Sequence, residues 1–297
     1  AYTRTTYNTY NNSNEQAVVL GNNVTMQDTV TATGQIVSDP ASKVTLNGDV
    51  TSTAGIGTVT TEQFDASNTQ TGKTVIDSMD DSVSGGIILG ETTAGAVTLK
   101  TEGGNISLGD NSILDGTTVS AESADLNKTV YSNDGGSWNT VASTEKLGTI
   151  EGSVTLGENT TVKGNSTLTA DDNIAIGNNS VITGNTTADG VISAGGQISI
   201  GDGTQVLDNT AINLADGQTL YIGSGAILSG NTSNGVSGSV QAGQNTRLNV
   251  YTDATAYTFI NDGISTTAAA STADAAPLAA DQTVMTKTGA GTLVYGG

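Results

Sequence analysis

A four-residue pattern, apolar–any–apolar–Gly, decides the fold. It recurs as Val154-Thr155-Leu156-Gly157, Ile174-Ala175-Ile176-Gly177, Ile198-Ser199-Ile200-Gly201 and Leu220-Tyr221-Ile222-Gly223. Earlier copies are Val18-Val19-Leu20-Gly21, Ile87-Ile88-Leu89-Gly90 and Ile106-Ser107-Leu108-Gly109. Alternating apolar residues are typical of a strand with one buried face, and the glycine that follows permits a tight corner.

The pattern returns about every 22 residues. Its final glycines are 20, 24 and 22 residues apart from Gly157 onward, and Gly90 and Gly109 are 19 apart. We interpret the gaps of 48 residues before Gly157 and 69 before Gly90 as two and three turns with weaker copies. The period predicts an all-β fold, a right-handed single-stranded parallel β-helix (β-solenoid) of about 22 residues per turn. About 12 or 13 turns, each rising roughly 4.8 Å, would give a rod about 60 Å long.

Composition agrees with a thin stacked core and excludes several classes of site. The 297 residues include no Cys, no His and only two Phe, and 29 acidic against nine basic residues give a charge of −20. Without His or Cys there is no Ser-His-Asp triad, ordinary zinc site or disulfide. The acidic excess argues against nucleic acid and anionic membranes. We expect no enzyme activity, no metal and no cofactor.

Three regions are expected along the chain. Residues 1–264 are predicted to form the β-helix, with an irregular excursion at 125–147 that contains the only Trp. Residues 265–283 are rich in Ala, Ser and Thr and predict a loop or linker. Residues 284–297 begin a different strand repeat.

That last repeat carries a family resemblance. Lys287, Gly289, Gly291 and Leu293 match the Lys-x-Gly-x-Gly-x-Leu repeat of bacterial type V autotransporter passenger domains, and the segment resembles AIDA-type and self-associating adhesins most. The resemblance implies a protein on the Gram-negative cell surface, outside the cell, after removal of a signal peptide. It also implies a membrane association made only through a C-terminal outer-membrane barrel, which is absent from this sequence.

The predicted function is adhesion. A rod with polar edges would bind other copies of itself, as in aggregation and biofilm formation, or a host extracellular-matrix protein or glycan. The alternative is a β-helix polysaccharide hydrolase or lyase, in which Glu158 and Asp202, two turns and about 10 Å apart, approach the roughly 6.5–9.5 Å spacing of inverting glycosidases. Both residues also suit simple turns. An ice-binding array is disfavoured because the Thr-x-Thr pairs do not recur in every turn.

Candidate partner-binding residues lie in two groups. The first is in the excursion, where aromatic side chains on a protruding loop are common anchors. The second contains one column of asparagines and the acidic residue that follows a strand-ending glycine. The candidates are Tyr131, Asp134, Trp138, Asn165, Asn185, Asn209, Asn231 and Asp202. The asparagine column has a competing interpretation as a structural ladder of amides between turns.

Other features are assigned mainly structural roles. Tyr2, Tyr7 and Tyr10 are expected to cap the first turn of the rod. The pairs Asp171-Asp172 and Asp80-Asp81 favour solvated turns over calcium sites, because neither follows a calcium-loop spacing. Glycosaminoglycan binding is disfavoured overall, although four lysines are candidates for a local basic spot: Lys100, Lys128, Lys146 and Lys163.

Overall fold

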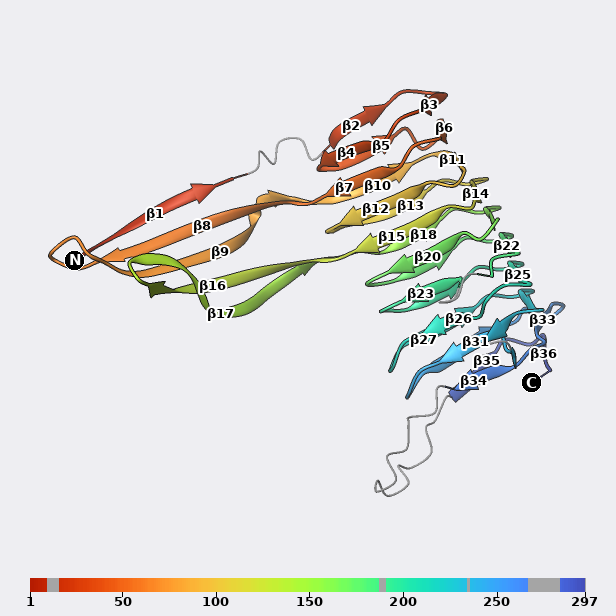
Figure 1. Ribbon diagram of the computed structural model, residues 1–297. Coiled ribbons are helices and arrows are strands. Elements are labelled where there is room, and N and C mark those ends of the chain that lie inside the picture. The colour runs from red at the N-terminus through yellow and green to blue at the C-terminus, as the bar shows by residue number, and fades with distance from the viewer. Residues whose placement is uncertain (10–15, 187–190, 234–235, 267–283, 297) are drawn as a thin grey trace, which may run out of the picture.

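The computed structural model describes residues 1–9, 16–186, 191–233, 236–266 and 284–296. These residues form strands and turns and contain no helix, so none is available to cross a bilayer. The chain winds into a right-handed parallel β-helix, and the predicted fold class is confirmed. Figure 1 shows the stacked turns, which we call the rod, and a separate group of long strands, which we call the arm.

Three parallel sheets run along the rod. The first contains β2 (Gln16–Leu20), β5 (Gln35–Ser38), β10 (Gly85–Leu89), β13 (Gly104–Leu108), β18 (Val154–Leu156), β21 (Ile174–Ile176), β24 (Ile198–Ile200), β27 (Thr219–Ile222), β32 (Arg247–Tyr251) and β35 (Val284–Thr288). The second contains β3 (Val24–Met26), β6 (Lys43–Leu46), β11 (Glu91–Ala94), β14 (Ile113–Asp115), β19 (Thr161–Lys163), β22 (Val181–Thr183), β25 (Gln205–Leu207), β28 (Ile227–Ser229), β33 (Tyr257–Ile260) and β36 (Thr292–Tyr295).

The third sheet and a small hairpin complete the rod. The third sheet contains β4 (Val30–Thr33), β7 (Val50–Thr53), β12 (Thr98–Glu102), β15 (Thr118–Glu122), β20 (Thr167–Ala170), β23 (Ile192–Ala194), β26 (Ile212–Leu214), β31 (Val240–Ala242) and β34 (Ile264–Thr266). The short strands β29 (Thr232–Ser233) and β30 (Val236–Ser237) pair antiparallel with each other.

Strand register confirms the period but corrects the number of turns. Val154, Ile174, Ile198 and Leu220 follow one another in the first sheet at steps of 20, 24 and 22 residues. Each long gap holds one turn fewer than expected. Ile106 pairs directly with Val154, so the gap before Gly157 is a single turn. The gap before Gly90 is two turns, because β5 lies between β2 and β10. In each gap one turn is enlarged by an inserted hairpin. The ten strands of the first sheet define ten turns among the described residues, and the rod is about 45 Å long.

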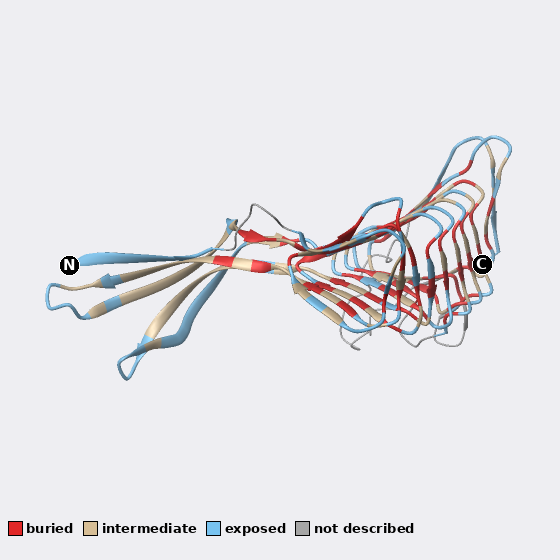
Figure 2. Ribbon diagram, turned by 90° about the horizontal axis from the view of Figure 1, so that it is seen from above, coloured by how far each residue is buried: buried red, intermediate tan, exposed pale blue. Residues whose placement is uncertain are grey.

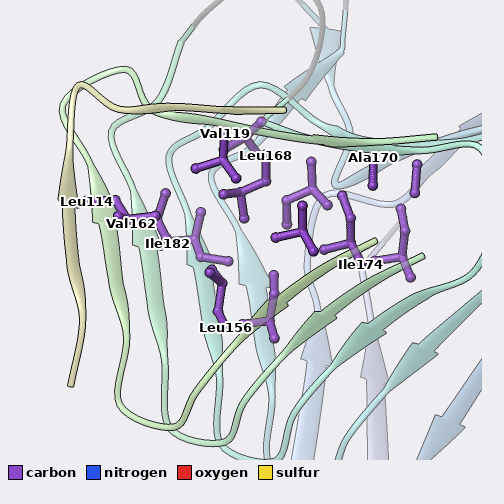
Figure 3. Packing of buried hydrophobic residues seen from close by; sticks show 14 of the residues in the cluster. Leu114, Val119, Leu156, Val162, Leu168, Ala170, Ile174 and Ile182 are labelled. Carbon is purple, nitrogen blue, oxygen red and sulfur yellow. The ribbon is translucent and has the colours of Figure 1, made fainter. Parts of the chain in front are cut away.

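The core is a column of aliphatic side chains. Leu114, Val162 and Ile182 are neighbours in the second sheet, and Val119 and Leu168 in the third; all five are completely buried. Figure 3 shows these layers stacked inside the coil. Each turn contributes only a few side chains, which explains how a chain poor in large apolar residues can fold.

Buried hydroxyls hold several of the corners that follow a strand-ending glycine. Asn159 adopts a left-handed φ of 56°, which turns the chain. Thr160 follows it, is buried, and donates from Oγ1 to the Gly157 carbonyl at 2.9 Å. Its backbone N–H donates to Ser180 Oγ in the next turn at 3.1 Å. This ladder explains the Ser or Thr found three residues after four of these glycines, at Ser112, Thr160, Ser180 and Thr204.

The arm is a five-stranded antiparallel sheet in the order β1 (Tyr2–Asn8), β8 (Gly55–Phe64), β9 (Gln70–Val83), β16 (Ala124–Asp134) and β17 (Ser137–Ile150). Two hairpins leave the rod between the third and first sheets, and they join where β9 pairs with β16. One turn without an insertion, made of β10, β11 and β12, lies between the two hairpins in the stack. It leads into β13 at Gly104, where a Cβ would clash with the Gly85 backbone, so only glycine fits this close approach. The arm projects away from the rod with little buried surface beyond its root (Figure 2).

The arm changes the predicted division of the chain. Residues 1–8 and 55–83 were expected in the coil but belong to the arm, because they lack the glycine-terminated repeat and pair antiparallel. The excursion expected at 125–147 corresponds to β16 and β17. Tyr2 and Tyr7 therefore do not cap the rod, and Tyr10 lies outside the described residues.

The C-terminal repeat continues the coil. In the span 265–283, residues 265–266 belong to β34, and the others lie outside the described part of the chain. β35 and β36 pair in register with β32 and β33 as a further turn. Lys287 Nζ donates to the carbonyls of Gly289 and Gly291 at 2.7 and 2.6 Å. The Lys-x-Gly-x-Gly motif therefore forms the corner between two sheets.

Candidate functional site

The arm presents one face on which aromatic and charged side chains gather. Tyr2 on β1 stacks on Phe64 of β8 with ring centroids 4.8 Å apart. Arg4 lies over the same Phe64 ring, 5.5 Å from its centroid, and donates from Nε to Glu62 at 2.7 Å. Cross-strand pairs of this kind hold β1 on the sheet although all seven of its residues are exposed.

The same face contains two of the predicted partner-binding residues. Lys73 Nζ lies 4.7 Å from the centroid of the Tyr131 ring and donates to the Trp138 carbonyl at 3.3 Å. Trp138, Lys73, Glu62 and Gln70 line a shallow cavity of about 240 Å³. Asp134 is exposed at the end of β16 and does not line this cavity. Lys73 is the residue that sequence reasoning missed here.

Charge is divided unevenly between rod and arm. We define the outer arm as residues 1–8, 58–77 and 127–146, which end at one level of the sheet, where Thr58 lies opposite Asp77 and Asn127 opposite Lys146. The part between this level and the rod is the root. The outer arm carries four basic and five acidic residues, a net charge of −1: Arg4, Lys73, Lys128, Lys146, Glu62, Asp65, Asp77, Asp134 and Glu145. The rest of the chain, with five basic and 24 acidic residues, therefore carries −19 of the formal charge of −20.

Three of the four predicted asparagines are wrong as partner-binding residues. Asn185, Asn209 and Asn231 are at most 1% exposed. Asn185 Nδ2 donates to Asn209 Oδ1 at 2.8 Å, and Asn209 Nδ2 donates to Asn231 Oδ1 at 3.2 Å. The competing interpretation, an internal amide ladder, is thus confirmed for these three. Asn165 is exposed instead, with a φ of 69°, and accepts the Thr186 N–H at 3.0 Å.

Asp202 lies at the rim of a groove on the first sheet. The groove has a volume of about 520 Å³ and is lined by Tyr221, Asn249, Tyr251 and two threonines of β35. Tyr221 and Tyr251 are 40% and 49% exposed. Tyr251 donates from its hydroxyl to Asp253 at 2.8 Å, and this bond raises the Tyr251 pKa. The pattern Leu220-Tyr221-Ile222 could have indicated the outward tyrosine, since the central residue of each strand faces solvent.

The carboxylates of the alternative enzymatic site take part in a ladder between turns. Asp110 Oδ1 accepts the Glu158 N–H at 2.7 Å, and Asn178 Oδ1 accepts the Asp202 N–H at 2.8 Å. Asn178 lies between the two acids and donates from Nδ2 to Glu158 at 3.1 Å. The stacking expected of this column is present, and its hydrogen bonds are those of structural turn residues.

Acidic pairs and lysines also have structural partners. Asp171 Oδ2 accepts the Ser123 N–H at 2.8 Å, and Asp172 Oδ2 accepts the Gly152 N–H at 2.7 Å. The described residues contain no cluster of three or more side chains suited to a metal. The four lysines considered as a basic spot each form an ion pair: Lys100 with Glu102 and Glu122, Lys128 with Glu145, Lys146 with Asp125 and Lys163 with Asp115.

Comparison with protein-family models, curated proteins and solved structures gives no match for this chain.

Proposed function

We propose that this chain is an adhesin whose rigid rod presents the arm to other copies of itself or to a host surface. The single observation that carries the proposal is the arm. It is a five-stranded sheet with exposed side chains on β1 and β17, built outside the core that stabilises the rod. Soluble proteins seldom maintain so much open sheet unless it serves an interaction.

Weak contacts suffice for this role. Many copies on one surface act together, so the avidity of an array greatly exceeds the affinity of one contact. The tyrosine groove offers a second surface for attachment, because aromatic rings beside carboxylate and amide groups suit a glycan or a protein loop. The resemblance at Lys287, Gly289, Gly291 and Leu293 supports a place on the Gram-negative cell surface, as in an autotransporter passenger.

The test is aggregation of particles that carry the purified chain. Latex beads coated with it, and cells displaying it, should clump and sediment faster than beads coated with an inert protein of equal charge. Binding of coated beads to matrix proteins and to a glycan array separates host attachment from self-association. Absence of clumping together with absence of binding on both panels would reject the adhesin proposal.

The hydrolase or lyase alternative is tested separately. The purified chain is incubated with a panel of polysaccharides, and new reducing ends or unsaturated products are measured. Product formed by the parent chain but not by the Glu158→Gln and Asp202→Asn variants would favour the enzyme over the adhesin.

A further inference from the structure

The arm has two edges, and they differ. Within the described residues β1 pairs only with β8, and β17 pairs with β16 alone. A strand at the edge of a sheet presents unpaired N–H and C=O groups toward its open side, which is a template for another strand. Each edge of the arm is therefore a place where a further strand could add.

The β17 edge is interrupted, whereas the β1 edge is regular. The register between β16 and β17 shifts at three places, near Leu126, Val130 and Ser132. Bulges of this kind twist an edge and block further pairing. β1 pairs with β8 without a shift over all seven residues, from Tyr2 opposite Phe64 to Asn8 opposite Thr58. Its single charge, Arg4, is already paired with Glu62. β1 therefore has none of the common protections against edge pairing.

The charge distribution favours a second copy of this chain as the partner, paired antiparallel to β1. A second copy brings another charge of −20, but its outer arm, like that of the first, carries a net charge of only −1. Antiparallel pairing of two β1 strands makes the arms point in opposite directions and places the rods at opposite ends of the joined sheet. The 14 residues of β17 indicate an arm about 45 Å long. That length exceeds the Debye length of about 8 Å at physiological salt, so repulsion between the rods is screened.

Symmetry then restricts the register. A twofold axis normal to the sheet pairs even-numbered residues with even and odd with odd, since directly opposite side chains share a face. One such register places Arg4 opposite Arg4 of the second copy, which is unfavourable. The next register uses all seven residues of β1. It places Thr5 opposite Thr5 and Thr3 opposite Tyr7, which are favourable cross-strand pairs, and it places Arg4 opposite Thr6, so no like charges face each other.

We propose that β1 is the docking edge for a second copy of this chain, which pairs with it antiparallel about a twofold axis through Thr5. The two arms then form one continuous ten-stranded sheet. This inference rests on the proposed function and supplies the contact through which self-association occurs.

Charge exchange at Thr5 tests the contact. Thr5→Lys places two like charges opposite each other, as does Thr5→Glu, so each variant alone should dimerise at least ten times more weakly in analytical ultracentrifugation. An equal mixture of the two pairs Lys with Glu and should regain affinity near that of the parent chain. Recovery in the mixture also shows that both variants fold. Ser143→Lys and Ser143→Glu on the β17 edge are the matched controls and should dimerise normally.

A cysteine at the same place tests the register, because the chain has no other cysteine. Opposite residues of antiparallel strands have Cα atoms about 4.5–5.5 Å apart, within the range that a disulfide accepts. Thr5→Cys should cross-link to a covalent dimer under mild oxidation, and Ser143→Cys should remain largely monomeric. Cross-linking of Ser143→Cys instead of Thr5→Cys would overturn the choice of edge.

The outcomes separate the inference from the proposed function. If the parent chain clumps beads and both single Thr5 variants still do so, the β1 edge is rejected while the adhesin proposal stands. If the parent chain neither dimerises nor clumps beads, self-association and the β1 contact both fail. Loss in the single variants with recovery in the mixture supports both.

Discussion

The rod and the arm are both made of β-strands, yet they are stabilised in different ways. In the rod, each turn buries aliphatic side chains against the turns on either side, and buried hydroxyl and amide ladders bond the corners. In the arm, the sheet is one layer thick, and its strands are held by cross-strand pairs and ion pairs at the surface. The comparison shows that stability and accessible surface come from different parts of one chain. The rod is stabilised by its buried core, and the arm exposes most of its outer strands.

The largest expected difference comes from removing the same side chain in the two regions. Ile182 is completely buried in the rod, whereas Ile76 in β9 of the arm is only partly buried. Ile182→Ala should lower the free energy of unfolding by about 2–5 kcal/mol, because it leaves a cavity in a close-packed column. Ile76→Ala should cost about 1 kcal/mol or less. Urea unfolding followed by circular dichroism measures both, and equal losses would contradict the distinction.

The internal amide ladder gives the next effect. Asn209→Ala removes the bonds that Nδ2 makes to the carbonyls of Ile182 and Leu207, each at 2.8 Å, and leaves buried acceptors without partners. We expect a loss of about 2 kcal/mol in unfolding free energy. Asn249→Ala, in the half-exposed groove, is the matched control and should change stability by less than about 0.5 kcal/mol. A loss in Asn249→Ala as large as that in Asn209→Ala would show that burial of the ladder is not what matters.

The sequence predicted the rod well because its residues repeat. Strand pattern, corner glycine and period all follow from the requirement that each turn stack on the last, as at Ile174 and Ile198. The arm was missed over residues 55–83, because alternating Thr and Val in a two-sided open sheet also fits a degenerate turn of a solenoid. Only long-range strand pairing, such as that of Lys73 with Tyr131, distinguishes an arm strand from a degenerate turn of the solenoid.

The candidate site shows the same limit. The rarity of Tyr131 and Trp138 and their place outside the repeat are visible in the sequence, and in the structure both contact Lys73. The sequence shows that the asparagines form a column, but it does not show whether their side chains face the core or the solvent. A shift of one residue along a strand or corner moves a side chain from solvent to core, and that separates the buried Asn185 from the exposed Asn165.

Salt should change the strength of association mainly by screening the repulsion between the acidic rods, and it should have little effect on the contact between the outer arms. Raising ionic strength from about 0.01 to 0.15 M shortens the Debye length from about 30 to 8 Å and screens the repulsion between two charges of −20. Dimerisation should strengthen several-fold over this range and then change little up to about 1 M, because the outer arms, each with a net charge of only −1, carry the contact. Light scattering across the series measures this. Association that weakens as salt rises would indicate that unlike charges hold the copies together.

The smallest expected effect lies at the root of the arm, where an exposed ion pair joins β16 to β17. The hydrogen bond from Lys146 to Asp125 lowers the pKa of that carboxyl, and Thr149 adds a weaker one at 3.3 Å. A carboxyl whose pKa is lower in the folded state stabilises the fold at neutral pH, and this contribution is lost as the pH falls through the folded pKa. Because both side chains are exposed, the change in arm stability should be slight. Carbon-13 NMR of the Asp125 carboxyl should show a midpoint below the ordinary aspartate range, and Lys146→Ala should move it upward. An unchanged midpoint in that variant would mean that the Lys146 pair does not persist in solution. The arm would then depend on backbone pairing alone at its junction with the rod.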